Sequence, residues 1–441
     1  MNSTIFGAGY VGLVSGACLA ELGHQIVCCD LDAARIAALS RGELPIHEPG
    51  LGELVRRHLA SGQLRFAPAG AAAAAEAEVV FIAVGTPTRR GDGHADVTFV
   101  HAAAAAAAQA LTRPALVVTK STVPVGTTRE VARLVRAQRP ELEVAANPEF
   151  LREGSAVEDF LHPDRIVLGV DGSGAEQLLR RVYAPLSAGG ARILSTSYET
   201  AELIKYAANG FLATKLTYLN ELTALCEAVG GDLEALLAGL AMDPRIGAAY
   251  LRPGPGFGGS CLPKDVQALM RTAQQHGVAC RVVESVIEAN AAHQARMVQK
   301  IRAALGGSET GKTLAVLGLT FKADTDDMRH APSLAILPAL ADRGAIIRAH
   351  DPQGLREARG LLPAACELSD DLDRVLTGAD AVVLMTDWPV YLRLDFAAVA
   401  RQLAGRVVID LRNALPAATL RGHGLEVHRL GSRAGAPGAA R

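Results

Sequence analysis

The sequence predicts an α/β protein with two doubly wound, Rossmann-like domains joined by a helical central region that contains one long helix. Three observations lead to this fold class. Short apolar strands alternate with helix-length segments, a glycine-rich turn directly follows the first strand, and the order strand, loop, helix, strand and aspartate occurs twice. We expect domains at 1–196, 197–304 and 305–430, and a disordered tail at 431–441.

The composition is that of a soluble globular protein, with 49% hydrophobic residues, 20% charged residues and a net charge of −2. It shows no basic excess for nucleic acid, no apolar run long enough for a membrane and no signal-like N-terminus. The seven cysteines form no C-x-x-C pair, which disfavours disulfides and bound metal. We therefore expect a cytoplasmic protein.

The first strand, Thr4–Phe6, is followed at once by Gly7-Ala8-Gly9-Tyr10-Val11-Gly12 and a helical run, and the second strand ends on Asp30. The first glycine allows the turn, the second lets a pyrophosphate approach the backbone, and the third lets helix and strand pack closely. Asp30 is placed to accept a hydrogen bond from a ribose 2′-OH, which favours NAD over NADP. Arg35 either covers the adenine or is solvated.

Further strands at 78–84, 116–119 and 144–146 continue the first sheet. In a parallel sheet, ligands bind beyond the carboxyl ends of the strands. Four polar residues that follow strand ends are site candidates: Thr86, Thr122, Glu149 and Glu153. The two glutamates share one face if their segment is helical, and a solvated face is the alternative.

The central region begins with a long helical pattern that opens at Thr196–Glu199, which has capping-box spacing, and runs to Val229. Lys205 and Asn209 lie four residues apart on one of its faces, where they are either buried with partners or exposed. Residues 267–304 are predicted to be helical as well. This region has enough apolar surface to form a dimer interface.

The segment Gly254–Asp265 contains four glycines and two prolines around Cys261. Such a composition predicts a tight loop, and we expect its backbone N–H groups to face a ligand beside the thiol. A lone intracellular cysteine is more often a small buried residue, but burial alone does not explain the neighbouring glycines.

The C-terminal half repeats the first unit with strands at 313–318, 345–349, 381–385 and 407–410, but it lacks G-x-G-x-x-G. We therefore expect a second domain of related topology that binds something other than a complete dinucleotide. Lys322, Arg329 and Arg412 follow strand ends, where they either pair with phosphates or are solvated.

Six features taken in order resemble the UDP-glucose/GDP-mannose dehydrogenase family from residue 4 to residue 412. They are GAGYVG, KSTVPVGT, NPEFLREG, the helix with Lys205 and Asn209, GFGGSCLPKD and GLTFKADTDDMR. The resemblance implies an NAD-binding first domain, a catalytic and dimer-forming middle, and a third domain that binds the UDP-sugar. It also implies a homodimer or a higher homo-oligomer.

The implied activity is a four-electron oxidation of a nucleotide sugar. For the branch that the chain resembles more closely, NAD oxidises the C6 alcohol of UDP-glucose to the acid UDP-glucuronate. Cys261 would hold the intermediate aldehyde as a thiohemiacetal and then as a thioester. Lys205 would assist the thiolate and, with Asn209, stabilise oxyanions.

The resemblance assigns proton transfer and thioester hydrolysis to Asp265, acting with Thr122 and a water molecule. Glu153 matches a carboxylate that serves either proton transfer or the hydrolytic water. Glu149 would support the site.

The resemblance also implies the ligand contacts. Residues expected to contact NAD are Gly7, Gly9, Tyr10, Val11, Gly12, Asp30, Arg35, Thr86, Thr122, Glu153, Lys264 and Arg329. Residues expected to contact the UDP-sugar are Glu149, Phe150, Leu151, Lys205, Asn209, Arg245, Tyr250, Phe257, Gly258, Phe321, Lys322 and Arg412, with Arg245 reaching it from a partner subunit.

Three other functions remain open. Leu262 departs from the phenylalanine that is common in the UDP-glucose branch and matches GDP-mannose 6-dehydrogenases. A one-step hydroxyacid dehydrogenase would share the first domain without needing Cys261. A non-catalytic NAD-binding protein would bind NAD without turning over any nucleotide sugar.

Overall fold

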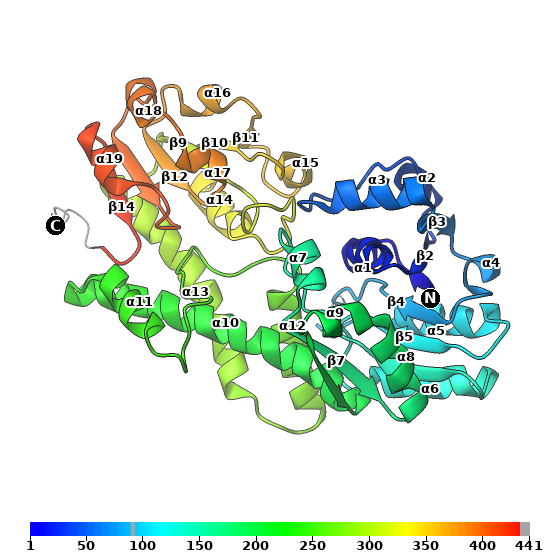
Figure 1. Ribbon diagram of the computed structural model, residues 1–441. Coiled ribbons are helices and arrows are strands. Elements are labelled where there is room, and N and C mark those ends of the chain that lie inside the picture. Colours follow the sequence, from blue (N-terminus) through cyan, green and yellow to red (C-terminus); the bar gives the residue numbers. More distant parts are fainter. Residues whose placement is uncertain (90–92, 433–441) are drawn as a thin grey trace. The chain divides into compact units, whose positions relative to one another are not determined.

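The computed structural model describes residues 1–89 and 93–432 of the chain (Figure 1). Residues 433–441 of the predicted disordered tail lie outside the described residues, whereas Gly431 is buried and donates its N–H to Glu227 at 2.8 Å. None of the described helices is both long and apolar enough to cross a membrane.

The chain divides into two compact units. The first consists of Met1–Ala208 and Gln267–Val278, and the second of Asn209–Val266 and Ala279 onward. Two helices pass from one unit into the other along the chain: α10 (Tyr198–Val229) and α12 (Leu262–Gln275).

The sheet of the first unit follows the order β3-β2-β1-β4-β5-β6-β7-β8. Its neighbouring strands are parallel except for β6 and β7, which are antiparallel, so the expectation of a wholly parallel sheet is wrong at this pair. The sequence analysis did not predict β3, β7 and β8. The strand bounds are β1 Asn2–Phe6, β2 Gln25–Asp30, β3 Leu64–Pro68, β4 Val79–Ile82, β5 Leu116–Thr119, β6 Glu143–Ala146, β7 Arg165–Val170 and β8 Arg192–Thr196.

Helices cover both faces of this sheet. Consecutive strand residues point to opposite faces, so Ile5 packs in the apolar layer formed with α1, α3, α7 and α8, whereas Phe6 packs in the layer formed with α5, α6 and the start of α10. Both faces are therefore apolar, as in a doubly wound fold. The helix bounds are α1 Tyr10–Glu21, α2 Ala33–Ser40, α3 Leu51–Ser61, α4 Ala71–Ala74, α5 Thr98–Ala110, α6 Thr127–Gln138, α7 Ala156–Leu161, α8 Ser173–Val182 and α9 Ala184–Ala188.

The sheet of the second unit follows the order β11-β10-β9-β12-β13-β14. This order repeats that of the first six strands of the first sheet, which confirms the predicted pair of Rossmann-like domains. The strands are β9 Thr313–Leu317, β10 Ile346–His350, β11 Cys366–Leu368, β12 Ala381–Leu384, β13 Val407–Asp410 and β14 Glu426–Arg429. The remaining helices are α11 Leu233–Ala241, α13 Arg281–Ala304, α14 Ser333–Ala341, α15 Leu355–Ala358, α16 Leu372–Leu376, α17 Pro389–Leu392, α18 Phe396–Gln402 and α19 Ala417–Gly422.

The helix predicted over 267–304 is two helices, α12 and α13. Gly277 has a φ of 67°, which is left-handed, and the next N–H, from Val278, donates to the Ala273 carbonyl at 2.9 Å. This is the backbone pattern that closes a helix at a glycine. The long helix α10 is confirmed, and its cap is Ser197, whose Oγ accepts from the N–H of Thr200 at 3.2 Å.

Candidate active site

The turn after β1 leaves open space at the N-terminus of α1. An ideal Cβ at Gly7 would lie 2.6 Å from the Ala83 carbonyl oxygen, and one at Gly12 would lie 1.8 Å from that of Gly7, so packing requires glycine at both positions. A Cβ at Gly9 would meet no atom within 4 Å. The free N–H groups and the dipole at this helix end attract anions, so the cradle fits a pyrophosphate.

Asp30 lies at the end of β2, where its Oδ2 accepts from the N–H of Ala8 at 2.8 Å and from Arg35 Nη1 at 3.2 Å. Arg35 is therefore paired with Asp30, an outcome that neither alternative for Arg35 anticipated. The Asp30 side chain remains 14% exposed. Because a carboxylate offers about four acceptor positions, Asp30 can still accept from a ribose hydroxyl.

Glu48 joins the nucleotide turn to the segment that carries Glu153. The Tyr10 hydroxyl donates to Glu48 Oε2, and the N–H groups of Gly154 and Ala156 donate to the same carboxylate at 2.6 and 2.8 Å. Burial and the hydrogen bond to Glu48 raise the pKa of Tyr10. The sequence analysis missed Glu48, because its partners lie far from it in the sequence and its own segment has no periodic pattern.

Glu149 and Lys205 form a buried ion pair. The Lys205 Nζ lies 3.0 Å from Glu149 Oε1, and the two side chains are 4% and 5% exposed. The N–H of Leu151 donates to the other carboxylate oxygen at 2.6 Å, and the Phe150 ring centroid lies 5.5 Å from Nζ. Burial would raise the pKa of Glu149, but the charge of Lys205 and the N–H of Leu151 outweigh it and lower this pKa.

Glu153 is buried in a turn just before α7. Residues 147–152 form no regular secondary structure, so the condition for a shared helical face of Glu149 and Glu153 is not met, and both glutamates are buried instead of lying on a solvated face. Val11 lies in the first turn of α1 and is half-buried.

Lys120 is a second buried cation in this unit, and the sequence analysis assigned it no role. Its Nζ donates to Asn147 Oδ1 at 3.0 Å and to the Tyr183 hydroxyl at 3.5 Å. Burial lowers the pKa of Lys120 to about 8, although the charge of Glu149 opposes this shift. The signal that pointed to Lys120 was its place directly after a buried strand.

Thr86 and Thr122 connect the loops after β4 and β5, since the Thr86 hydroxyl donates to the Thr122 carbonyl at 2.8 Å. Thr122 also lines a pocket together with Lys205 and Glu202. Burial raises the pKa of Glu202 to about 7, against the lowering effect of two N–H groups at the start of α6. The first unit thus brings together Thr122, Glu149, Phe150, Leu151 and Lys205.

In the second unit, the glycines of the loop before α12 are required by packing. Gly256 and Gly259 have φ values of 123° and 87°. A Cβ at Gly258 would lie 2.3 Å from the His330 carbonyl oxygen, and one at Gly259 would lie 2.8 Å from the Phe321 ring. Close approach of the chain to itself therefore explains these glycines.

Three N–H groups of this loop meet protein acceptors and therefore do not face a ligand, in contrast to our expectation for these three. Since a buried backbone must satisfy its polar groups, α10 and α13 supply side chains for this purpose. Gly254 donates to Asn220 at 3.1 Å, Phe257 to Asn290 at 2.9 Å, and Gly259 to the Arg329 carbonyl at 2.9 Å.

His293 holds the same loop from α13 and was also missed by the sequence analysis. Its Nε2 bonds to the Gly254 carbonyl at 2.7 Å, so this nitrogen carries the proton. Burial lowers the pKa of His293 to about 4, which keeps the ring neutral near pH 7.

Cys261 ends the loop, half-exposed, with its Sγ 3.4 Å from Ser260 Oγ. Asp265 lies one turn further along and is buried. Asn209 Nδ2 donates to one Asp265 oxygen at 2.6 Å, and Lys264 Nζ lies 2.6 Å from the other. The second unit therefore orients a buried carboxylate from two sides on the helix that begins directly after the thiol.

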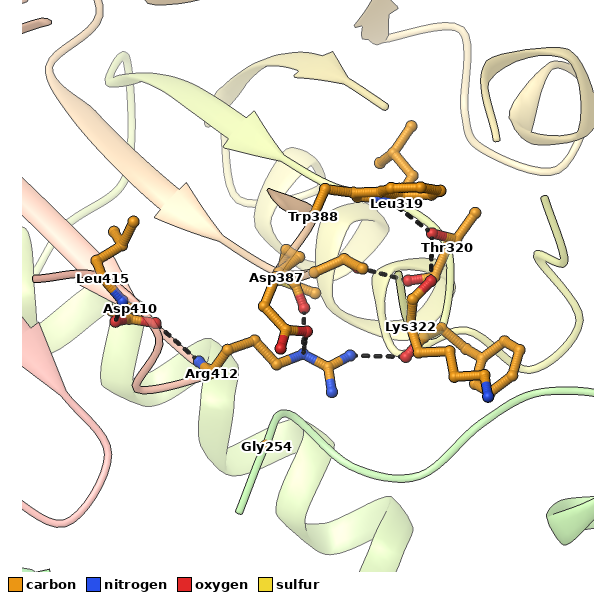
Figure 2. A network of polar contacts seen from close by, with 12 residues as sticks. Gly254, Leu319, Thr320, Lys322, Asp387, Trp388, Asp410, Arg412 and Leu415 are labelled. Atoms are coloured by element: carbon orange, nitrogen blue, oxygen red, sulfur yellow. Dashed lines mark hydrogen bonds and ion pairs between the residues drawn. The ribbon is translucent and has the colours of Figure 1, made fainter. Parts of the chain in front are cut away.

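Arg412 connects the ends of three strands in the second unit (Figure 2). Its Nε donates to the Met385 carbonyl and its Nη2 to the Phe321 carbonyl, both at 2.7 Å. Burial lowers the pKa of Arg412, and the charge of Asp387 opposes this shift. Arginine stays charged in proteins, so Arg412 and the neighbouring loop residue Lys322 supply two cations to this end of the sheet.

Two predicted ligand-binding arginines pair with their own loops. Arg245, whose side chain is 88% exposed, lies 2.6 Å from Asp243, and Arg329 lies 2.8 Å from Asp327. Tyr250 has a φ of 61°, which is left-handed. Their ligand contacts stay predictions.

Comparison with known protein families covers all three predicted parts of the chain. Residues 1–187 match the NAD binding domain of the UDP-glucose/GDP-mannose dehydrogenase family, residues 199–292 its central domain, and residues 315–417 its UDP binding domain.

Individual relatives match over nearly the full length. The chain is 47% identical to a UDP-glucose 6-dehydrogenase of Rhizobium meliloti (strain 1021), covering 98% of this chain and 99% of the relative. It is 42% identical to a UDP-glucose 6-dehydrogenase of Bacillus subtilis (strain 168), covering 100% of both. A solved UDP-glucose dehydrogenase from the hyperthermophilic archaeon Pyrobaculum islandicum has a TM-score of 0.89 at 38% identity, covering 98% of each chain.

Proposed function

The chain belongs to the UDP-glucose/GDP-mannose dehydrogenase family, and on this basis we propose that it oxidises the C6 alcohol of UDP-glucose to UDP-glucuronate with NAD. The observation that carries the proposal is Cys261, a half-exposed thiol at the end of a packed glycine loop. Two oxidations at one carbon require the aldehyde to be held between them, and a thiol can hold it covalently.

The first unit carries most of the residues that would hold NAD. The open cradle at Gly9 suits the pyrophosphate, and Asp30 retains acceptor capacity for a ribose. When bound, NAD supplies the hydride acceptor for both oxidations. The residues that we assign to NAD are Gly7, Gly9, Tyr10, Val11, Gly12, Asp30, Arg35, Thr86, Thr122, Glu153, Lys264 and Arg329.

Cys261 acts once the alcohol has become an aldehyde. Its Sγ adds to the aldehyde carbon, and the carbonyl oxygen takes up a proton, which gives a thiohemiacetal. Oxidation of this adduct leaves a thioester, and water then displaces Sγ, which forms the acid and returns the thiol. Lys205 and Asn209 would stabilise the charged oxygen in these steps.

Asp265 is suited to proton transfer during hydrolysis, because Asn209 and Lys264 fix both of its oxygens. We assign it, with Thr122, to the activation of the hydrolytic water. Glu153 is assigned either to proton transfer or to the hydrolytic water, and Glu149 to holding Lys205 in its charged form.

The second unit offers the groups that would bind the nucleotide end of the substrate. Lys322 and Arg412 are cations that pair well with a diphosphate, and Phe321 offers an aromatic face. The residues that we assign to the UDP-sugar are Glu149, Phe150, Leu151, Lys205, Asn209, Arg245, Tyr250, Phe257, Gly258, Phe321, Lys322 and Arg412.

The test is the amount of NADH formed per UDP-glucose consumed, run to completion with excess NAD. We expect two NADH per sugar, with UDP-glucuronate as the product. One NADH per sugar would instead indicate a one-step dehydrogenase. No turnover of UDP-glucose, with two NADH per GDP-mannose, would assign the chain to the other branch, and bound NAD without any turnover would indicate a non-catalytic protein.

We also propose that the chain forms a homodimer through α10. Phe211, Tyr218 and Leu225 are 71%, 56% and 57% exposed and recur every seven residues, which places them along one side of the helix. A continuous exposed apolar stripe of this kind is typical of an interface.

Replacing Phe211 and Leu225 together by glutamate should halve the mass measured by light scattering, whereas Leu361→Glu, at an exposed apolar site elsewhere, should leave the mass unchanged. A monomeric wild-type protein would contradict the proposal.

Two further proposals concern location and domain limits. We place the enzyme in the cytoplasm because all seven cysteines are free thiols, and cell fractionation tests this location. We retain domain limits at 1–196, 197–304 and 305–430. The two compact units and the family matches divide the chain at other residues, so limited proteolysis is the appropriate test.

A further inference from the structure

The turn after β9 repeats the backbone geometry of the turn after β1. The N–H of Gly7 donates to the Cys29 carbonyl and the N–H of Gly318 to the His350 carbonyl, both at 2.8 Å. The two glycines have φ values of 102° and 90°. Each turn therefore starts with the same left-handed glycine, bonded to the end of the neighbouring strand.

Each turn also bonds to an aspartate at the end of that neighbouring strand. The N–H of Ala8 donates to Asp30 at 2.8 Å, and the N–H of Leu319 donates to Asp351 at 2.6 Å. The two acids then differ in exposure, because the Asp30 side chain is 14% exposed whereas Asp351 is 1% exposed.

Donors within the protein occupy all acceptor positions of the Asp351 carboxylate. A carboxylate has about four acceptor positions, so none is left for a ribose hydroxyl. Its donors are the N–H groups of Leu319, Thr320, Gln353 and Gly354 and the indole N–H of Trp388.

Trp388 connects this carboxylate to the loop that follows β9. Its indole N–H lies 3.2 Å from Thr320 Oγ1 (Figure 2). The same N–H lies 3.2 Å from Asp351 Oδ2, and the ring is buried. The Thr320 hydroxyl in turn lies 2.9 Å from the Lys322 carbonyl oxygen. A chain of hydrogen bonds therefore runs from Trp388 to the backbone of Lys322.

We propose that Trp388 and Asp351 are positioning residues for the nucleotide end of the substrate, because they hold the segment Thr320–Lys322 in the conformation that presents Phe321 and Lys322. The inference rests on the proposed function. Asp30 in the first unit is open to a ligand, whereas the corresponding Asp351 in the second unit is bonded within the protein. The turn after β9 that Asp351 holds leads directly into Phe321 and Lys322. Pre-ordering such a loop improves affinity, because less entropy is lost when the ligand binds.

The first test is Trp388→Phe, which keeps an aromatic ring and removes the N–H. We expect the Kd for UDP, measured by calorimetry, and the KM for UDP-glucose to rise about tenfold, while kcat and the KM for NAD change less than about twofold. The matched control is Tyr391→Phe, which removes a buried hydroxyl of α17 that bonds to His350. A merely structural role would lower the melting temperature of both variants and leave the KM for UDP-glucose and the Kd for UDP unchanged, and this result would overturn the proposal.

A second measurement uses the wild-type protein and stands even if the variant does not fold. Trp388 is the only tryptophan in the chain, so its fluorescence reports on this loop alone. Adding UDP without NAD should change the emission in a saturable way. Unchanged emission at UDP concentrations that calorimetry shows to be saturating would overturn the inference. The proposed function fails separately, if the wild-type protein binds UDP but does not oxidise UDP-glucose.

Discussion

Replacing Cys261 by serine should lower the rate of acid formation by on the order of 10³-fold or more, because the covalent nucleophile is lost. A serine hydroxyl is far less ionised than a thiol near neutral pH, so it does not trap the aldehyde or form the thioester. The measurement is UDP-glucuronate formed from UDP-glucose and NAD, separated by chromatography.

Cys280 provides the matched control for this variant. It is also half-exposed, but it lies before α13, outside the glycine loop. Cys280→Ser should keep the wild-type rate. Acid formation by Cys261→Ser at more than a tenth of the wild-type rate would rule out the thioester route.

Replacing Lys205 by methionine should abolish activity and lower the free energy of unfolding by about 3–5 kcal/mol. The substitution keeps an unbranched apolar stem but leaves Glu149 as a buried charge without its partner. Adding Glu149→Gln to this variant removes the uncompensated charge, so the double variant should recover most of the stability and none of the activity. Urea unfolding and the NADH assay measure the two effects.

The stability of the wild-type protein and that of Lys205→Met should change in opposite directions as the pH falls. In the folded wild-type protein the pKa of Glu149 is lowered from its ordinary value of 4.5. Its stabilising contribution is therefore present above pH 4.5 and is lost as the pH falls through the lower, folded pKa. In Lys205→Met, burial without the cation should raise this pKa above 4.5, so the variant should gain stability as the pH falls from 7 towards 4.5. Parallel stability curves for the two proteins would contradict this account.

The predicted and missed strands differ in their position within the sheets. The central strands β5 and β13 were predicted with their observed bounds, because both are short, almost continuously buried apolar runs. Four of the missed strands, β3, β8, β11 and β14, form the edges of the two sheets. Edge strands are partly exposed and polar, so their sequences lack the apolar run that marks a central strand.

The candidate site was predicted in part. Glu149 and Cys261 could be identified because each lies in a segment whose local pattern indicates a strand end or a tight loop. Glu48, Lys120 and His293 could not be assigned, because what defines them is a partner elsewhere in the chain. Glu48, for example, accepts from Gly154, which lies 106 positions away.

The amino-acid sequence by itself determined the two Rossmann-like sheets, the glycine-rich turn after the first strand and the tight glycine loop that carries Cys261, because apolar periodicity and glycine spacing are local properties. Only the tertiary structure decided how the polar groups are used. It paired Arg35 with Asp30, directed three N–H groups of the cysteine loop to protein acceptors, and bonded Asp351 internally to Trp388. The physical reason is that every buried donor and acceptor must find a partner, and which partner is within reach depends on the folded path of distant segments.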